Sequence, residues 1–442
     1  MSAPLPTRPV GVVLAAGFGS RLDHGPKPLK RVAGTTLLER ALATLRQAGV
    51  GPVIVVVGHA KGEIERFVSA HGLDVELVEN GDFHLGNGTS ALVGGRAAAG
   101  RFVVVMADHV FEPEAVRSLL ESAAPFALAV DTRPRFCELE EATKVRIAGD
   151  RILAVGRDLD PCDGVDVGLA ACDRDVIAAG ERALAAGAGS WNDVKRQWIE
   201  EGRELTAVDL AGSFWTDVDT PADANRAERL LVRRAARKRQ DGLVSRLVNR
   251  RFSWRLSLLF VRLGLTPSAV TALTFALTLV AAATLALGAR SWIALVAGGV
   301  LVQLVSIVDG CDGEVARASL RSSQAGAFLD AVLDRIGDSA LLVALAIAAG
   351  FGTTATALLV AALVVSSLVP YVRASYEATF RRPLPPSRLP IGGHDVRLLA
   401  IALSAVVLQP IAGLAATAVL GTVELAARFL ASRRGLVTTV DS

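Results

Sequence analysis

The chain contains few cysteines, and they form no recognisable pattern. Four occur among 442 residues, with no CxxC pair and no Cys/His cluster. This usage argues against a disulfide framework and is typical of reduced thiols in a cytosolic setting. Residues 1–10 also lack the charged start and long apolar run of a secretory signal. We therefore expect the N-terminal part of the chain to stay in the cytoplasm.

Two common phosphate-binding signatures are missing as well. The sequence has no Gly-Lys-Ser/Thr of a Walker loop, and its first glycine turn lacks the GxGxxG spacing of a dinucleotide site. No internal repeat or long low-complexity stretch is present either. These absences exclude a P-loop and a dinucleotide fingerprint at this turn.

Apolar residues, in contrast, are abundant. At 442 residues the chain is too long for one domain. It is 51% hydrophobic with a mean hydropathy of +0.43, which makes it too apolar for a wholly soluble protein. The formal net charge is only +3, but residues 233–262 hold ten basic residues and one acid. Next to a membrane segment, such a stretch predicts a cytoplasmic flank under the positive-inside rule. Binding of anionic lipids is an alternative role for it.

Four aspartates lie at or within the apolar runs of the C-terminal half: Asp309, Asp312, Asp330 and Asp334. Spacings of three and four put each pair on one face of its own helix, so two helices can bring four oxygen ligands together. A carboxylate at mid-membrane costs roughly 3 kcal/mol, so four of them need compensation. Mg²⁺ or Mn²⁺ would neutralise them and leave positions for phosphate oxygens. Helix-end acids that simply face water are the alternative.

Small residues and an arginine accompany these acids. Gly313, Ala316 and Gly326 lack bulk, which lets helices or a nucleotide approach closely, and Arg317 can bind a phosphate as a fork. The full spacing, Asp-x2-Asp-Gly-x2-Ala-Arg-x8-Gly-x3-Asp-x3-Asp, resembles the motif of the CDP-alcohol phosphotransferase family without departure. The resemblance covers the chain from about residue 247 onward. It implies that the four aspartates hold two metal ions and that Asp334 is also the general base.

A second candidate site begins near the N-terminus. A β-branched run at residues 10–15 breaks into a glycine turn and then a basic loop. This order predicts a strand, a turn with exposed backbone N–H groups, and mobile positive charge for a triphosphate. A plain structural turn is the alternative. The residues that carry this interpretation are Leu14, Ala15, Gly17, Gly19, Ser20, Arg21 and Lys27.

This opening resembles the sugar-phosphate nucleotidyltransferase family, which begins Leu-x-Ala-Gly-x-Gly-Ser-Arg-Leu and continues with Pro-Lys-Pro-Leu. Residues 14–22 and 26–29 match it closely. The resemblance implies an α/β Rossmann-like domain in which Arg21 and Lys27 are catalytic. Alternating strand-like and helix-like blocks support a doubly wound sheet. These blocks are residues 53–58, 62–69, 75–78, 90–98 and 102–107.

Asp108 follows the last of these predicted strands. Ligands collect at the carboxyl ends of strands in open α/β sheets, so this acid is well placed to bind a metal; a helix cap is the alternative. The resemblance implies that Asp108 holds the catalytic divalent ion and that Asp217, in Trp-Thr-Asp-Val-Asp-Thr-Pro, completes the site. Asp219 is accounted for more simply as part of a helix start before Pro221.

Two further segments resemble substrate-binding parts of the same family. Asn80, Asn87, Gly88 and Ser90 are similar to the base loop of its cytidylyltransferase branch, although a polar turn would account for them nearly as well. The region expected to hold the phosphorylated acceptor contains Asp131, Thr143, Lys144, Gly156, Arg157, Asp166 and Gly168. Where the inositol-phosphate branch tends to have Gly-Lys, this chain has Arg157, which keeps the charge.

The C-terminal half is predicted to be an all-α domain of six transmembrane helices. A charged helix at residues 222–240 leads to an interfacial helix in which Phe252, Leu256, Leu259 and Leu263 recur at helical spacing. The six spans are residues 268–288, 291–308, 325–349, 353–373, 394–409 and 411–431. An even number of spans, flanked by arginines, places both ends in the cytoplasm. The predicted domains are residues 1–230, a linker with the interfacial helix at 231–265, and residues 266–442.

Arginines cluster where the fourth span ends and the fifth begins. Arg373 and Arg397 lie at apolar edges, where they could clamp a second phosphate. Topology alone is the alternative reason for this cluster, which also contains Arg381, Arg382 and Arg388. Family members that use inositol phosphate likewise place basic residues here.

The fusion of the two halves resembles the bifunctional inositol-1-phosphate cytidylyltransferases and di-myo-inositol phosphate phosphate synthases. The resemblance implies that CTP and inositol 1-phosphate give CDP-inositol and pyrophosphate. Phosphoinositol then passes to a second inositol 1-phosphate and CMP leaves. It also implies Mg²⁺ or Mn²⁺ in both domains, a homodimer through the membrane helices, an inner-membrane location and no nucleic-acid partner. A membrane phospholipid synthase is the alternative, and a nucleotidyltransferase with a mere anchor or transporter is a third hypothesis.

Overall fold

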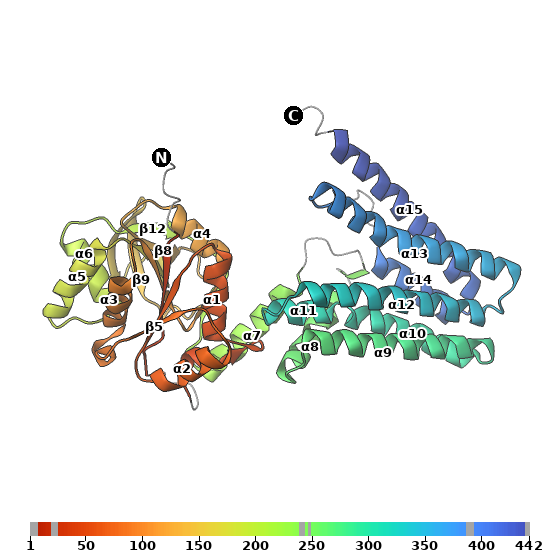
Figure 1. Ribbon diagram of the computed structural model, residues 1–442, viewed down its shortest axis with the longest axis horizontal. Coiled ribbons are helices and arrows are strands. Elements are labelled where there is room, and N and C mark those ends of the chain that lie inside the picture. Colours follow the sequence, from red (N-terminus) through yellow and green to blue (C-terminus); the bar gives the residue numbers. More distant parts are fainter. Residues whose placement is uncertain (1–7, 19–24, 238–243, 246–248, 386–392, 438–442) are drawn as a thin grey trace. The chain divides into compact units, whose positions relative to one another are not determined.

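The computed structural model describes residues 8–18, 25–237, 244–245, 249–385 and 393–437. The chain divides into two compact units, Met1–Glu228 and Arg229–Ser442 (Figure 1). Helix α7 (Pro221–Ala235) contains the boundary between them.

The first unit is an α/β domain. Its strands are β1 (Val10–Leu14), β2 (Arg31–Val32), β3 (Thr35–Thr36), β4 (Val53–Val57), β5 (Glu76–Glu79), β6 (Phe102–Met106), β7 (His109–Phe111), β8 (Phe126–Asp131), β9 (Lys144–Ala148), β10 (Arg151–Gly156), β11 (Gly164–Cys172), β12 (Thr206–Asp209) and β13 (Trp215–Asp217). Its helices before α7 are α1 (Leu37–Gln47), α2 (Lys61–Ala70), α3 (Asn87–Ala97), α4 (Pro113–Glu121), α5 (Asp175–Ala185) and α6 (Trp191–Glu200). The predicted strands and helices thus occur with small shifts at their ends. The segment expected to be a base loop is different, because residues 87–90 form the first turn of α3.

The main sheet has nine strands in the order β5-β4-β1-β6-β11-β8-β12-β10-β9. The four strands β5, β4, β1 and β6 run parallel, whereas β11 is antiparallel to β6 and begins a mixed half. Helices α1, α2 and α4 pack on one face, and α3, α5 and α6 pack on the other (Figure 1). The carboxyl ends of the four parallel strands therefore meet at one edge, where ligands collect in such sheets.

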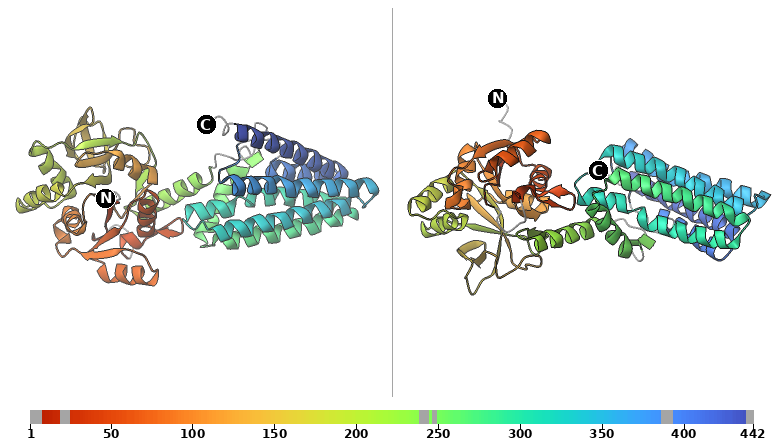
Figure 2. Two further views of the ribbon diagram at one scale, coloured as in Figure 1. Left: turned by 45° about the horizontal axis from the view of Figure 1, so that its top comes forward. Right: turned by 90° about the horizontal axis from the view of Figure 1, so that it is seen from below.

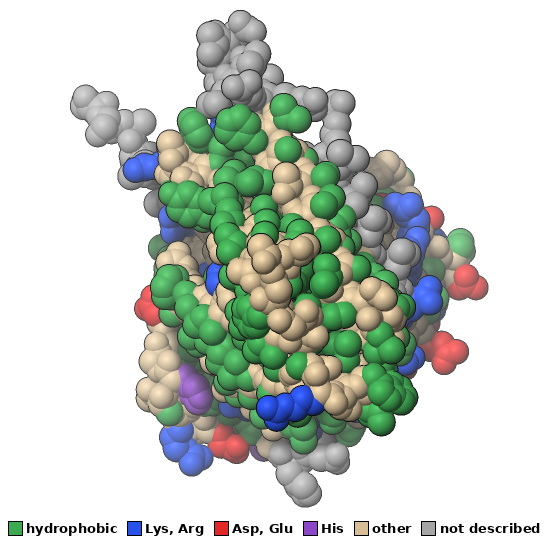
Figure 3. All heavy atoms as spheres, turned by 90° about the vertical axis from the view of Figure 1, so that its right-hand side faces the viewer, with side chains coloured by type: hydrophobic (Ala, Val, Ile, Leu, Met, Phe, Trp, Pro, Cys, Tyr) green, Lys and Arg blue, Asp and Glu red, His purple; other side chains and the backbone are tan. Residues whose placement is uncertain are grey.

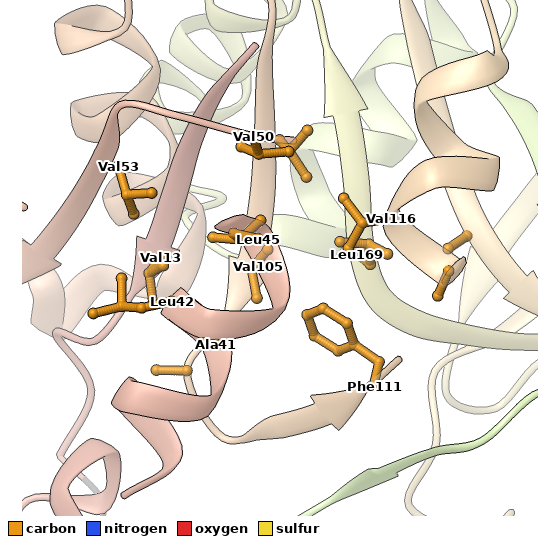
Figure 4. Packing of buried hydrophobic residues seen from close by; sticks show 14 of the residues in the cluster. Val13, Ala41, Leu42, Leu45, Val50, Val53, Val105, Phe111, Val116 and Leu169 are labelled. Carbon is orange, nitrogen blue, oxygen red and sulfur yellow. The ribbon is translucent and has the colours of Figure 1, made fainter. Parts of the chain in front are cut away.

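Both faces of the sheet are buried, which explains the continuous β-branched runs of its central strands. Along β1, Val13 belongs to the cluster with α1, while Val12 belongs to the cluster on the opposite face. Figure 4 shows how Leu42 and Leu45 of α1 pack near Val13 of the sheet.

A separate two-stranded ribbon carries part of the site. Strand β13 pairs antiparallel with β7, so that Asp217 lies opposite His109. Beside this ribbon, β11 changes register between Asp166 and Ala170, and Gly168 in this bulge has a φ of +76°. A Cβ at residue 168 would lie 2.9 Å from the His109 ring, so only glycine fits without displacing that ring.

The second unit is helical. Its helices are α8 (Arg250–Arg262), α9 (Pro267–Ala286), α10 (Trp292–Val308), α11 (Cys311–Ala318), α12 (Gln324–Ala348), α13 (Thr353–Phe380), α14 (His394–Val406) and α15 (Pro410–Val437). Figure 2 shows the long helices lying alongside one another in both views. Small residues allow close approach in this bundle: a Cβ on Gly298 of α10 would come within 2.8 Å of Leu285 of α9.

All six predicted spans coincide with helices, but not all of these helices are long and apolar enough to cross a bilayer. Within the described residues, four segments meet both conditions: Pro267–Ala289, Trp292–Ala318, Thr353–Phe380 and Pro410–Ser432. Helix α12 has the length but carries several charged residues, and α14 has only 13 residues. The predicted count of six spans is therefore not confirmed, because charged residues interrupt the apolar run of α12 and α14 ends at Val406. Many large hydrophobic side chains of the long helices are exposed, and Figure 3 shows hydrophobic side chains mixed with other types at the end of the helical unit.

Candidate active sites

The glycine turn lies at the ligand-collecting edge of the sheet. Leu14 and Ala15 are buried at the end of β1, where the Ala15 N–H donates to the Val56 carbonyl at 2.9 Å. Gly17 is exposed just beyond them, and open space surrounds it. Gly19, Ser20 and Arg21 lie outside the described residues.

Lys27 links two acids from distant parts of the chain. Its Nζ donates to Oδ2 of Asp108 at 2.5 Å and also to Oδ1 of Asp219. Burial opposes the charge on Lys27, but the two carboxylates outweigh it and raise the Lys27 pKa. Burial likewise opposes ionisation of Asp108, yet His109 and Lys27 hold the Asp108 pKa well below its ordinary value. The pKa values of Lys27 and Asp108 thus both shift in the direction that keeps this ion pair charged.

His109 is the neighbour of Asp108 that the sequence-based prediction missed. Its Nδ1 lies 2.7 Å from Oδ1 of Asp108, and its ring is parallel to that of Trp215, with 6.2 Å between the ring centroids. Burial disfavours the imidazolium, but Asp108 and Asp217 raise the His109 pKa. Its place directly after a predicted strand-end acid was the signal available in the sequence.

Asp217 provides a buried oxygen that is available to a ligand. Within the described part of the chain, its Oδ1 has no hydrogen-bond partner, and the nearest cation is Nη2 of Arg226 at 3.9 Å. Burial raises the Asp217 pKa. This oxygen, and the position that the Lys27 ammonium takes between Asp108 and Asp219, fit a divalent cation that prefers carboxylate oxygens. The contact with Lys27 also involves Asp219 more directly in the site than the sequence suggested.

The predicted base-reading residues are engaged with one another. Asn80 is buried, and its amide donates to the hydroxyls of Thr89 and Ser90 at 2.8 and 2.9 Å. The Asn87 side chain accepts from the Trp191 N–H at 2.9 Å. Gly88 lies so close to the Gly189 carbonyl that a Cβ would come within 2.5 Å of it. These contacts fix the first turn of α3 against α6, and a role in reading the base stays a prediction.

Two acids of the predicted acceptor region serve the fold. Asp131 is fully buried and accepts from Trp215 Nε1 at 2.8 Å, while Asp166 pairs with the buried Lys195. Lys195 was not predicted, because a lysine within an amphipathic helix is usually exposed. Lys144 lies half-buried in β9, and Arg157 is exposed just after β10.

In the helical unit, the four motif acids line one hollow of about 980 Å³. Asp309 follows α10, Asp312 lies on α11, and Asp330 and Asp334 lie on α12. The Thr271 hydroxyl donates to Oδ2 of Asp312 at 2.7 Å. Asp312 and Asp330 lie close enough for their carboxylates to repel each other.

Like charges in contact require a proton or a cation between them, so this acid set fits a divalent metal. Among the described residues, no three His, Cys, Asp or Glu side chains converge into a ready-made metal group. The four acids line one hollow, and the complete ligand set remains a prediction.

The small motif residues Gly313, Ala316 and Gly326 line the same hollow, together with Arg317 and Arg373. The Arg317 guanidinium donates to the Ala235 carbonyl at 2.8 and 3.0 Å.

Arg397 is placed differently from Arg373. It is buried and absent from the lining of the hollow, and among the described residues its Nη1 has no hydrogen-bond partner. The structure therefore separates two arginines that the sequence grouped together.

Two residues beside the acids were not predicted. His394, the first residue of α14, holds Asp338 through Nε2 at 2.7 Å, and its Nδ1 lies 3.9 Å from Oδ2 of Asp309. Asp338 comes four residues after Asp334, so its helical spacing could have identified it.

Two protein families match different parts of the chain. Residues 11–179 match the MobA-like NTP transferase domain, and residues 264–434 match the CDP-alcohol phosphatidyltransferase family. The solved inositol-1-phosphate CTP transferase of T. maritima is 25% identical, with a TM-score of 0.46, covering 50% of this chain and 95% of that one.

Two relatives match along most of their length. The chain is 46% identical over 431 residues to the bifunctional IPC transferase and DIPP synthase of Rubrobacter xylanophilus, covering 96% of each protein. The protein of the same name from Thermococcus kodakarensis is 36% identical over 338 residues, covering 76% of this chain and 75% of that protein. Because both halves match in one continuous relative, the chain belongs to the family of bifunctional IPC transferase and DIPP synthases.

Proposed function

We propose that the chain makes CDP-inositol from CTP and inositol 1-phosphate and then transfers phosphoinositol from CDP-inositol to a second inositol 1-phosphate. The observation that carries this proposal is the match of both halves to one bifunctional relative over 96% of each protein. In the first step, a phosphate oxygen of inositol 1-phosphate attacks the α-phosphorus of CTP and pyrophosphate leaves. In the second, the acceptor hydroxyl attacks the inositol-bearing phosphorus of CDP-inositol and CMP leaves.

In the first unit, Asp108 and Asp217 would hold a divalent cation, Mg²⁺ or Mn²⁺, which neutralises phosphate charge when bound. Lys27 already lies between two acids, and on binding CTP its ammonium would turn to the triphosphate. Gly19, Ser20 and Arg21 of the glycine-turn motif would bind the phosphates, as the sequence resemblance implies. Little covalent chemistry falls to the protein, so positioning and charge neutralisation supply most of the catalysis.

In the helical unit, Asp309, Asp312, Asp330 and Asp334 would hold the metal ions, and Asp334 would also take the proton of the acceptor hydroxyl. Their common hollow supports this assignment. Gly313, Ala316 and Gly326 leave room for the nucleotide, and Arg317 would bind one of its phosphates. Arg373 would bind the phosphate of the acceptor.

The helical unit would lie in the inner membrane with its acids open to the cytoplasm, and two copies would associate through membrane helices. The basic flank before α9 supports this orientation. The apolar side chains exposed on the long helices support burial in lipid or against a second copy.

The direct test is to incubate the full chain in detergent or lipid with labelled CTP and inositol 1-phosphate. We expect pyrophosphate and CDP-inositol first, and then CMP and a water-soluble product that contains two inositols. Omission of inositol 1-phosphate should stop both steps. A labelled product that partitions into organic solvent would favour a phospholipid synthase instead, and absence of CDP-inositol would reject the first activity.

A further inference from the structure

Glu314 is an acid that the proposed chemistry does not use, although it lies two residues from Asp312. Its side chain is completely buried. It pairs with Arg250 and accepts hydrogen bonds from the Ser253 and Ser257 hydroxyls, both at 2.7 Å. All three partners lie on α8, so one carboxylate fastens α11 to α8.

A buried ion pair of this kind is weak evidence for added stability, because apolar residues of similar volume stabilise a fold as well or better. What the ion pair does here is hold α11 in a defined orientation against α8. Residues two apart on a helix point to different sides, so Glu314 faces α8 while Asp312 receives the Thr271 hydroxyl of α9. Helix α11 is therefore bonded to α8 through Glu314 and to α9 through Asp312. Its orientation determines where Asp312 lies in the hollow.

The opposite face of α8 has a different character. Phe252, Leu259 and Leu263 are 50%, 49% and 63% exposed. Arg251 and Arg255 are also exposed, next to this apolar stripe. A helix with exposed apolar residues bordered by arginines has the composition of an element that lies in the surface of a bilayer. The arginines select the charge of that surface, because each basic residue near anionic headgroups adds to binding.

We propose that an anionic lipid surface fixes the position of α8, and that Glu314, by holding α11 against α8, thereby fixes the position of Asp312. The acid site of the helical unit would then keep its metal-binding shape only while α8 rests on charged lipid. This inference rests on the metal-holding role proposed above for Asp312. It makes α8 the element through which membrane composition sets phosphotransferase activity.

The test uses the full chain in phosphatidylcholine nanodiscs prepared with and without phosphatidylglycerol. Hydrogen exchange of residues 250–262 and 311–318 reports the two helices. Mn²⁺ binding, measured in the Asp108→Ala background to remove the proposed site of the first unit and corrected with empty discs, reports the acids of the helical unit without requiring turnover. In the unchanged protein, phosphatidylglycerol should slow exchange in both segments and strengthen Mn²⁺ binding. Equal exchange and equal Mn²⁺ binding in the two lipids would overturn the proposal.

Variants distinguish the binding of α8 to lipid from the effect of that binding on α11 and Asp312. Glu314→Gln should keep the lipid-dependent protection of 250–262 but lose that of 311–318, with Mn²⁺ binding on the order of tenfold weaker, as for other residues that orient metal ligands. Ser253→Ala with Ser257→Ala should act in the same direction if Glu314→Gln does not fold. Retention of the full lipid response by these variants would remove Glu314 from the pathway.

Arg251→Gln with Arg255→Gln should lose the response to phosphatidylglycerol, because each arginine contributes about fivefold to the affinity for an anionic surface. In neutral discs this variant should match the unchanged protein. Arg290→Gln removes an exposed arginine at the other end of α9 and is the matched control, which should keep the response. If the unchanged protein binds Mn²⁺ in neither lipid, the metal assignment fails together with the transmission step. In that case, hydrogen exchange of residues 250–262 still tests whether anionic lipid holds α8.

Discussion

The Lys27 ammonium lies 2.5 Å from the Asp108 carboxylate, although 81 residues separate the two in the chain. The same ammonium donates to Asp219, so it occupies a position between two acids that a divalent cation would also favour. In the proposed function, binding of the divalent cation would displace the Lys27 ammonium from this position.

Lys27→Ala should strongly lower the rate of CDP-inositol formation. The loss of a charge-assisted contact to the triphosphate costs about 1.5 to 3 kcal/mol, or roughly ten- to hundredfold in kcat/KM. Pyrophosphate release measures this step. The same variant should still release CMP from supplied CDP-inositol, and normal pyrophosphate release would remove Lys27 from the site.

Asp108→Ala should also block CDP-inositol formation without affecting the second step, because it removes a ligand of the proposed metal. Asp173→Ala is a suitable control, since that acid is exposed in its contact with Arg101 on another side of the domain. Activity of the Asp108 variant at ordinary Mg²⁺ concentrations would contradict the assignment.

Asp217→Asn should lower activity while leaving the metal-free protein at least as stable. Because burial raises the Asp217 pKa, this group favours folding when protonated, and the contribution is lost as the pH rises through its folded pKa. The neutral amide avoids that loss. Thermal unfolding in the presence of a chelator should therefore show that the stability of the variant, relative to that of the unchanged protein, rises between about pH 4 and neutral pH. A variant that loses ground over this range would show that Asp217 is stabilised as a carboxylate.

Asp334→Asn should leave the protein folded in membranes and abolish CMP release from supplied CDP-inositol, because an amide cannot act as a base. Pyrophosphate release by the other unit should persist. Equal loss of both activities would argue against two independent sites.

Arg373→Ala should raise the KM for inositol 1-phosphate roughly ten- to hundredfold, while the KM for CDP-inositol changes little. Arg397→Ala provides the comparison. Because Arg397 is buried and does not line the hollow, we expect its loss to lower the yield of folded protein rather than acceptor affinity. A selective KM effect of Arg397→Ala with normal yield would restore its predicted role at the phosphate.

The sequence predicted those parts of the molecule that local patterns encode. Strands β1, β4 and β6 were evident because short, continuous β-branched runs are typical of strands buried on both faces. The acids of α12 were evident because helical spacing places Asp330 and Asp334 on one face.

The parts that escaped prediction depend on contacts between distant residues. The ribbon of β7 and β13 consists of two three-residue strands, too short to show any period. The contact of Lys27 with Asp219 joins residues 192 apart, and no local pattern could show it. Glu314 looks like an ordinary surface acid of a helix until its burial against α8 is known.

Helix α13 has 28 residues, and at about 1.5 Å per residue it is about 42 Å long. A hydrocarbon core is only about 30 Å thick, so an untilted helix of this length would project by roughly two turns. The predicted span ended at residue 373, yet the helix continues without a break to Phe380. Arg373, about 30 Å along the helix from Thr353 and three residues after Pro370, would then lie at the depth of the lipid phosphates. Bilayer thickness should thus decide whether that arginine meets a water-borne acceptor or a neighbouring headgroup.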